Sequence, residues 1–272
     1  MLSHHFDESY QGNAAQNYQR YFVPVIGKPL ALRLLDVADL QKDEQVLDVG
    51  CGTGVVTRLA ARRVQTPGRV AGLDINPGML EVARAETRAP DRVEWHEGSA
   101  DDLPFADGRF DVVLCQMGLQ FFPRPAAAMS EMHRVLRPGG RAVLNLPGPI
   151  APLFRVLSKA VGTHVTPQAS KFVDQVFALD DPDHLRSLIQ DAGFSDVEVR
   201  TERPVLGLPS ARDFLWQYVS STPLGALVKA AGEEALTTLE EEVVGAWAAF
   251  TKEGRMEYQQ SMLVGRGMKK PH

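Results

Sequence analysis

The chain has 272 residues, of which 44% are hydrophobic and 23% are charged, and its formal net charge is -5. This length and balance suit one large domain, or a core with a smaller addition, and they exclude a disordered or fibrous chain. An acidic chain lacks the electrostatic footprint that drives binding to a phosphate backbone, so no nucleic-acid partner is expected.

The two cysteines, Cys51 and Cys115, lie far apart and form no CxxC pair. The sequence therefore encodes neither a disulfide framework nor a metal site, and a reducing compartment is indicated. The N-terminal segment lacks the apolar stretch of a signal peptide, and no uncharged run approaches the ~18 to 20 residues that a membrane span needs. We expect a cytoplasmic protein with no membrane span.

From Gln45 onward, short strand patterns alternate with helical patterns. Helices are predicted after the first strand, around Met129 and around Leu185, where apolar residues recur at helical spacing. This alternation is typical of an α/β fold, a doubly wound parallel sheet with helices on both faces. The predicted strands are 45–49, 69–73, 93–96, 110–115, 141–146, 196–201 and 259–267.

Three segments fall outside this repeating unit and read as largely helical: 1–40, about 148–180 and about 204–255. A doubly wound sheet binds its ligand at the carboxyl ends of the strands, and long excursions from that edge are where a lid or cap is built. We therefore expect an N-terminal helical lid at 1–40, a binding core at 41–147, and remaining strands with cap insertions at 148–272.

The stretch "VLDVGCGTG" places Gly50, Gly52 and Gly54 between the first strand and the first helix. Glycines here let the backbone approach a ligand closely. A dinucleotide fingerprint would have its third glycine at Val55, and no Gly-Lys-Ser/Thr of a phosphate-binding loop follows. The second strand ends in Asp74, at the place where an acidic side chain accepts hydrogen bonds from ribose hydroxyls. A nucleoside without a pyrophosphate is therefore indicated.

Five segments together resemble the class I S-adenosylmethionine-dependent methyltransferases, particularly the small-molecule group that includes the quinone-biosynthesis methylases. The resemblance covers about 40–147 and implies a Rossmann-like, mostly parallel seven-stranded sheet with S-adenosyl-L-methionine as cofactor. The segments that carry it occur in the family's order: "VLDVGCGTG", "GLDINPGML", "EGSADDLPF", "FDVVLCQMGLQFFP" and "EMHRVLRPGGRAVLNL".

By this resemblance the glycine turn would hold the methionine part of the cofactor, Asp74 the ribose, and Ser99 with Ala100 the adenine edge. The family often has Asp where this chain has Ser99, so the contact to the adenine amino group is either weaker or moved to Asp101. Ile75 and Met79 either contact the purine or belong to the core. The full predicted cofactor set is Tyr21, Asp48, Gly50, Cys51, Gly52, Gly54, Asp74, Ile75, Met79, Ser99, Ala100, Asp101, Gln116 and Met117.

Methyl transfer from a sulfonium is an in-line displacement that needs no protein nucleophile, so holding the acceptor at attack distance can supply most of the catalysis. A general base helps if the acceptor is a hydroxyl. His164 is the predicted base, and the alternative is a surface histidine; His4 and His5 are secondary candidates.

Four residues are predicted to contact the acceptor: Tyr18, Gln120, Trp216 and Tyr218. Tyr18 and Tyr21 are spaced to share one helical face, and the segment around Trp216 places apolar side chains together, which suits an aromatic or hydrophobic pocket. Ordinary helix packing explains the same patterns.

The favoured hypothesis is an enzyme that methylates a small, apolar or aromatic molecule at oxygen or carbon. The segment "CQMGLQFF" lacks the Asn/Asp-Pro-Pro-aromatic motif of the family's members that methylate amino groups of DNA and protein glutamine. The alternatives are a nicotinamide-dependent oxidoreductase and a non-catalytic protein that binds S-adenosylmethionine. The sequence leaves the identity of the acceptor and the oligomeric state open.

Overall fold

The computed structural model describes residues 13–65, 69–88 and 93–271. The chain divides into two compact units. The sheet unit comprises Lys28–Gly148, Leu179–Glu202 and Met262–His272, and the helical unit comprises Met1–Gly27, Pro149–Ala178 and Arg203–Ser261. The helix α3 (Lys28–Ala38) therefore belongs with the sheet, whereas the sequence placed it in an N-terminal lid.

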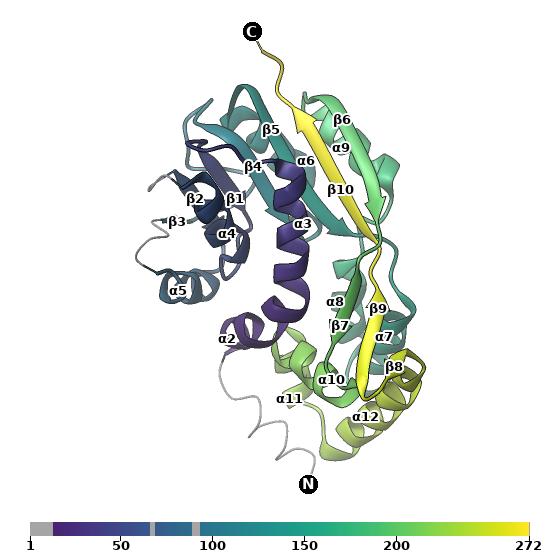
Figure 1. Cartoon of the computed structure of the whole chain (residues 1–272). Helices are drawn as coiled ribbons and strands as arrows, with labels where there is room; N and C mark the ends of the chain where they lie inside the picture. The colour runs from purple at the N-terminus through teal and green to yellow at the C-terminus, as the bar shows by residue number, and fades with distance from the viewer. Residues whose placement is uncertain (1–12, 66–68, 89–92, 272) are drawn as a thin grey trace. The chain divides into compact units, whose positions relative to one another are not determined.

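A seven-stranded sheet forms the centre of the sheet unit, in the order β3-β2-β1-β4-β5-β10-β6 (Figure 1). Only β10 runs antiparallel to its two neighbours. The strand order reverses between β1 and β4, and ligands of such sheets bind at the carboxyl ends of the strands at this switch point. The strands are β1 (Val46–Val49), β2 (Val70–Asp74), β3 (Val93–Glu97), β4 (Phe110–Gln116), β5 (Leu136–Pro147), β6 (Ser195–Glu202) and β10 (Met262–Met268).

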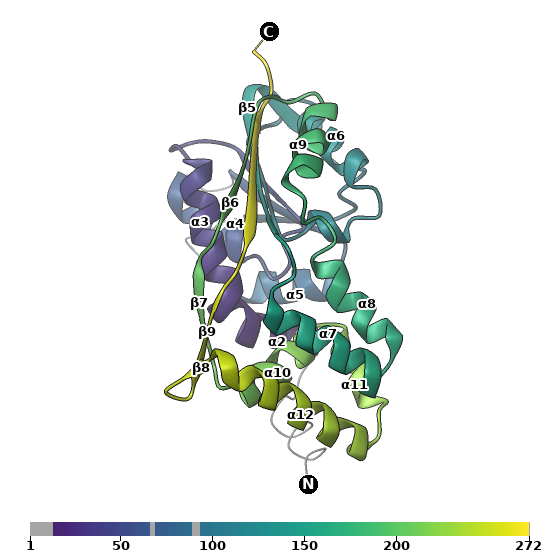
Figure 2. The same ribbon diagram turned by 90° about the vertical axis from the view of Figure 1, so that its right-hand side faces the viewer.

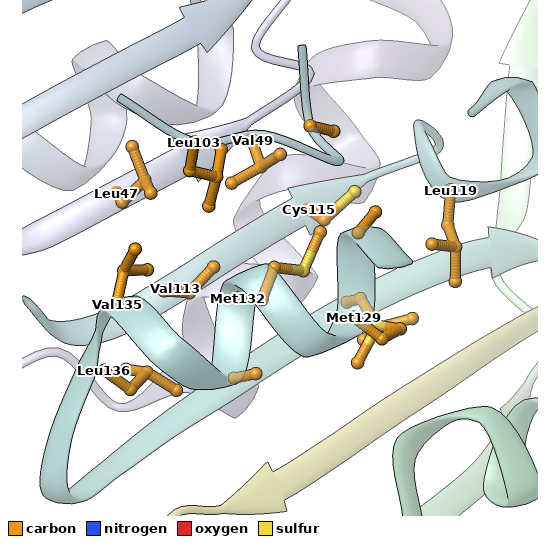
Figure 3. Close-up of a cluster of buried hydrophobic side chains, with 14 of the residues drawn as sticks. Leu47, Val49, Leu103, Val113, Cys115, Leu119, Met129, Met132, Val135 and Leu136 are labelled. Carbon is orange, nitrogen blue, oxygen red and sulfur yellow. The ribbon is translucent and has the colours of Figure 1, made fainter. Parts of the chain in front are cut away.

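Helices cover both faces of this sheet, which confirms the predicted fold class (Figure 2). One face packs against α3 and α4 (Val55–Val64), and the other against α6 (Pro125–Val135) and α9 (Pro182–Asp191). The central strands are buried on both sides, so successive residues feed the two cores alternately. Figure 3 shows one core, in which strand residues such as Leu47 and Val113 lie against Met132 and Val135 of α6. The helix α5 (Pro77–Ala85) packs against β2 and β3.

Arg141 of β5 fixes the end of α3 in the sheet unit. Its guanidinium donates to the carbonyl oxygens of Ala38 at 2.7 Å and Asp39 at 2.9 Å, and to both carboxylate oxygens of Glu44 at 2.7 and 2.9 Å. The last carbonyls of a helix lack partners within the helix, so this side chain satisfies groups that would otherwise depend on water.

The helical unit contains a small sheet in segments that the sequence predicted as largely helical. It has the order β7-β9-β8 and consists of β7 (Val205–Leu208), β9 (Arg255–Gln259) and β8 (Thr251–Lys252). Alternate residues of β7 and β9 are buried, a period of two that the surrounding helical pattern obscured. The predicted strand 259–267 is consequently wrong at its start: β9 ends at Gln259 and β10 begins at Met262.

Aromatic side chains form the core of the helical unit. The ring of Phe154 lies 5.2 Å from that of Tyr218 and 5.9 Å from that of Tyr258, and Phe214 lies 5.5 Å from Trp247.

No helix among the described residues is both long and apolar enough to cross a bilayer. The helices of this unit are α2 (Ala14–Asn17), a π-helix (Tyr18–Gly27), α7 (Pro152–His164), α8 (Pro167–Val176), α10 (Ala211–Ser220), α11 (Leu224–Lys229) and α12 (Glu233–Trp247).

Candidate functional site

The three glycines of the turn after β1 have left-handed backbone angles, with φ of +70° at Gly50, +54° at Gly52 and +80° at Gly54. Their surroundings differ. A Cβ at Gly50 would lie 3.2 Å from the ring of Phe122, and one at Gly54 would overlap the ring of Trp95. A Cβ at Gly52 would meet no atom within 4 Å. Two of the glycines therefore make room for aromatic rings, and only Gly52 faces open space.

The N–H groups of this turn are largely used inside the protein. The amides of Gly50 and Cys51 donate to the Leu73 carbonyl oxygen at 2.8 and 3.0 Å. Gly52 N–H donates to the Asp74 carboxylate at 2.7 Å, and Gly54 N–H to the Cys51 carbonyl at 2.9 Å. An anion cradle needs free N–H groups, so this turn is poorly suited to a pyrophosphate. The backbone groups of the turn that a ligand can contact are therefore mainly carbonyl oxygens, which are hydrogen-bond acceptors and suit a cation such as an ammonium group.

The side chain of Asp48, a residue of β1, lies at the beginning of α4. Its side chain is 1% exposed and accepts a hydrogen bond of 2.5 Å from the Thr57 hydroxyl. Burial raises the pKa of this carboxyl to about 7, against the opposing effect of its hydrogen bonds from Thr57. A helix N-terminus attracts anions, and here a buried carboxyl already fills that position.

Asp74 joins the end of β2 to the glycine turn. One carboxylate oxygen accepts from Gly52 N–H and the other from Asn76 N–H at 2.9 Å. A carboxylate has about four acceptor sites, and three backbone N–H groups, those of Gly52, Ile75 and Asn76, act on Asp74, so acceptor capacity remains for a hydroxyl of a ribose. Burial raises the pKa of Asp74 above its ordinary value. Next to it Ile75 is 67% exposed, an apolar side chain available to a ligand, whereas Met79 is half-buried.

The segment after β3 lies beside Asp74, because Gly98 N–H donates to the Asp74 carbonyl oxygen at 3.1 Å. The Ser99 hydroxyl donates to one carboxylate oxygen of Asp101, and Arg124 Nε donates to the other at 2.6 Å. These hydrogen bonds, with that from Ser99 the larger effect, hold the pKa of Asp101 below its usual range. Ala100 is buried at 7% exposure.

The end of β4 carries backbone strain. Met117 has φ of +49°, a conformation that non-glycine residues rarely adopt, and its N–H donates to the Asn145 carbonyl oxygen at 2.9 Å. Strain of this kind persists where the surrounding structure enforces it and clusters at functional sites. Gln116 is half-buried at the same edge, whereas Gln120, predicted to face the acceptor, is 3% exposed.

Trp95, Phe122 and Arg58 support the turn, and the sequence analysis did not assign them. Trp95 of β3 packs across Gly72 of β2 as well as Gly54. Arg58 of α4 is 7% exposed and donates to the Thr53 carbonyl oxygen at 2.5 Å. The one sequence feature that could have indicated this packing is the presence of glycines on two neighbouring elements, Gly54 and Gly72, together with a tryptophan on the adjacent strand.

Three of the predicted ligand-contacting residues lie in the aromatic core of the helical unit or against it. Tyr18 stacks on Phe22 with 4.6 Å between ring centroids, and Tyr218 is 4% exposed. Trp216 is 3% exposed and donates from Nε1 to Glu240 at 2.6 Å. These environments match the packing alternative, and contacts of these side chains with an acceptor stay predictions. Tyr21, predicted for the cofactor, lies under the Arg20 guanidinium, 5.2 Å from the ring centroid.

His164 ends α7, and its Nε2 lies 2.7 Å from a carboxylate oxygen of Glu242 on α12. A carboxylate partner of this kind orients an imidazole. The pair is compatible with a base and equally with a structural contact, so the catalytic role stays a prediction. His4 and His5 lie outside the described residues. Among the residues that the structure describes, no three His, Cys, Asp or Glu side chains gather in a way that could hold a metal ion.

Comparisons with known proteins show the family to which the chain belongs. A family model described as a methyltransferase domain matches residues 47–144. Demethylmenaquinone methyltransferase of Staphylococcus epidermidis is 34% identical over 180 residues, which span 62% of this chain and 75% of that protein. The chain belongs to this family and is an S-adenosylmethionine-dependent methyltransferase. No comparison supports the oxidoreductase alternative.

Solved structures show the same fold at low identity. The YcgJ protein of Bacillus subtilis is similar with a TM-score of 0.58 and 19% identity, covering 89% of this chain and 98% of that one. Phosphoethanolamine N-methyltransferase 2 of Haemonchus contortus, solved with S-adenosyl-L-methionine, gives a TM-score of 0.55 and 18% identity, covering 90% and 53%. The fold class predicted from the sequence is thereby confirmed.

The residues present fit S-adenosylmethionine, the cofactor of this family. The turn keeps its N–H groups for internal bonds, faces open space at Gly52 and lies beside a carboxylate with spare acceptor capacity. An amino acid with a free ammonium joined to a nucleoside matches that donor and acceptor set better than a dinucleotide does.

The unequal surroundings of the glycines give a testable difference in stability. We expect Gly54→Ala to lower the free energy of unfolding by about 3 kcal/mol or more. The new methyl group would overlap the Trp95 ring, and alanine would have to adopt the left-handed backbone conformation of Gly54. Gly52→Ala adds only the backbone strain, about 1 kcal/mol. Urea unfolding measures both. Trp95→Leu in the Gly54→Ala background should recover part of the loss, and equal losses for the two glycines would contradict the packing role.

The buried carboxyl of Asp48 predicts a pH dependence. Its folded pKa of about 7 exceeds the ordinary 3.8, so between these values the folded state binds a proton that the unfolded state has released. The contribution of Asp48 to stability therefore falls as pH rises through this window and levels off above it, by about 4 kcal/mol in total. Unfolding of Asp48→Asn and the unmodified chain, compared from about pH 4.5 to about pH 7.5, should show the variant gaining relative stability. A constant difference would refute the raised pKa.

Proposed function

We propose that this methyltransferase acts on oxygen or carbon of a small, apolar or aromatic acceptor. The observation that carries this proposal is the character of the segment Cys115–Phe122, which comprises the end of β4 and the turn after it and contains no charged side chain. Burial raises the pKa of its one ionisable group, the Cys115 thiol, to about 12. A charged acceptor would find no side chain of opposite charge along this segment, whereas a neutral ring needs none.

The names of the relatives support a quinone-type ring as the acceptor class. Several relatives are named demethylmenaquinone methyltransferase, an activity on a quinone ring. The reduced, hydroquinone form of such a ring is electron-rich and carries two hydroxyl groups, so it offers both a carbon and an oxygen nucleophile, which agrees with the preference for carbon or oxygen. Phe121, 45% exposed in the turn after β4, is an apolar surface at which such a ring could bind.

The chain's own residues would act by binding and orientation. S-adenosylmethionine supplies an activated methyl group that the acceptor attacks directly, so the protein needs no nucleophile of its own. Asp74 would hold the ribose, and carbonyls of the turn around Gly52 would receive the ammonium. Ser99 and Ala100 would face the adenine, with Ile75 against its ring. Positioning of the two reactants can be worth up to about 7 to 11 kcal/mol, and exclusion of water adds to it.

The ribose assignment is tested by Asp74→Asn. The amide cannot accept from two hydroxyls and the Gly52 and Asn76 amides at once, so we expect calorimetry to show S-adenosylhomocysteine binding about 10- to 100-fold more weakly. Glu97→Gln, an exposed carboxylate at the end of β3, is the matched control and should bind as the unmodified chain does. Unchanged affinity in Asp74→Asn, with the fold intact, would remove Asp74 from the site.

The acceptor class is tested by incubating the full chain with S-adenosylmethionine and a panel of reduced naphthoquinols, simple phenols, carboxylic acids, thiols and amines. We expect mass spectrometry to detect methylated naphthoquinol or phenol, and Asp74→Asn to lower the yield. His164→Gln should lower the rate by about 10²-fold or more for a hydroxyl acceptor and little for an activated carbon. Product only from the amines, or no product despite tight cofactor binding, would overturn the proposal; the latter favours a non-catalytic protein.

The remaining expectations rest on the sequence alone. A cytoplasmic location and the absence of a nucleic-acid partner stay predictions, derived from the cysteine usage and the charge of the chain. The oligomeric state stays open.

A further inference from the structure

A buried tyrosine in the helical unit is surrounded by apolar rings. Tyr218 of α10 is 4% exposed. Its ring centroid lies 5.2 Å from that of Phe154, 5.9 Å from that of Phe214 and 6.4 Å from that of Phe22. All four residues belong to the helical unit. A phenylalanine in place of Tyr218 would make the same ring contacts, so packing alone does not account for the hydroxyl group.

The Tyr218 hydroxyl forms no hydrogen bond with any group in residues 13–65, 69–88 and 93–271. The polar atoms that are both unpartnered and completely enclosed include the amide oxygen of Asn145 but not the Tyr218 oxygen. The Tyr218 oxygen therefore keeps accessible surface at which another atom can bind. A buried hydroxyl without a partner costs free energy unless a bound ligand or water completes it.

Tyr258 of β9, in the same aromatic core, has a partner for its hydroxyl. Its ring lies 5.9 Å from that of Phe154, and its hydroxyl donates to the side-chain oxygen of Gln260. Gln260 in turn donates from Nε2 to the Ser261 carbonyl oxygen at 2.5 Å. The Tyr258 proton is therefore used within the protein. Of the two tyrosines beside Phe154, only Tyr218 has a hydroxyl proton available to a ligand.

The surroundings of Tyr218 define the chemistry of its partner. Burial raises the pKa of the Tyr218 hydroxyl above its ordinary value, and the neighbouring Tyr18 adds to this effect. The hydroxyl therefore keeps its proton at neutral pH and acts as a hydrogen-bond donor, not as a base. The rings in contact with it carry no charge, so a carboxylate would lose its hydration there without a compensating cation. The oxygen of a neutral ring, such as a phenol, a quinol or a quinone, fits this donor.

We infer that the Tyr218 hydroxyl recognises the methyl acceptor by donating a hydrogen bond to an oxygen on its ring. The surrounding phenylalanine rings supply apolar contacts, and the single donor selects a ring that carries an oxygen over a plain hydrocarbon. This inference rests on the proposed function and deepens it, because it names the group that determines specificity. Tyr258, whose proton is already used, has a structural role only.

Tyr218→Phe and Tyr258→Phe remove the same atom from two tyrosines of one core, so the second is the matched control for the first. Tyr218→Phe breaks no hydrogen bond within the described residues, so the urea midpoint of unfolding should stay unchanged or rise. Tyr258→Phe leaves the Gln260 oxygen without its donor, so the midpoint should fall. A fall in Tyr218→Phe as large as that in Tyr258→Phe would show a structural role and overturn the inference.

Equilibrium dialysis of the full chain with 1-naphthol and 1-methylnaphthalene, a ring of similar size without an oxygen, tests the selection directly. The ratio of the two affinities should fall at least about fivefold in Tyr218→Phe and stay within about twofold in Tyr258→Phe. General changes in apolar contact affect both ligands and cancel in the ratio. 1-Tetralone, whose carbonyl can only accept a hydrogen bond, should lose affinity in Tyr218→Phe as well; a loss for 1-naphthol alone would overturn the assignment of Tyr218 as the donor.

The outcomes separate the inference from the proposed function. An unchanged ratio in Tyr218→Phe, with 1-naphthol still bound, would overturn the inference in favour of a bound water and leave the acceptor class standing. If the unmodified chain binds S-adenosylhomocysteine but neither naphthalene compound, the proposed acceptor class fails and the inference with it. Tyr218→Met, which also removes the hydroxyl, serves if Tyr218→Phe does not fold: the ratio should fall there too, and an unchanged ratio would equally refute the inference.

Discussion

The hydrogen bond from Gly52 N–H to the Asp74 carboxylate is the contact on which the site depends. It ties the turn after β1 to the end of β2, and it completes a pattern in which the turn's amides bond to the protein rather than to a ligand. With its donors already used, the turn is suited to a ligand that brings a cation and a sugar. The same glycine spacing with free amides would suit a phosphate.

Close packing around this turn constrains the sequence of the sheet unit. Trp95 packs against Gly54 and Gly72, and Phe122 packs against Gly50, so glycines of the turn and of β2 leave space for two aromatic rings. Asp48 lies at the same place, a buried carboxyl whose pKa is raised by desolvation. Such groups cost stability near neutral pH, and they are found where a site needs a specific charge arrangement. The two cores on either side of the sheet supply the compensating burial.

The polar groups of the site are arranged so that each direction of donation is fixed. The Arg124 guanidinium can only donate and the ionised Asp101 carboxylate can only accept, so the Ser99 hydroxyl donates to Asp101. Each carboxylate oxygen of Asp101 accepts one hydrogen bond from the protein, and a contact of Asp101 with the adenine stays a prediction.

The sequence by itself determined the fold class, the seven-stranded sheet and the family, because periodic burial and the spacing of turn residues are local properties. It also located Asp74 at the end of its strand. It did not distinguish the different surroundings of the three glycines or place Arg58 in the interior. It also did not predict the β7-β9-β8 sheet or the hydrogen bonds of Asp101 to Ser99 and Arg124. Those facts depend on which distant side chain meets a given backbone atom, as Trp95 meets Gly54, and only the packing of the folded chain decides that.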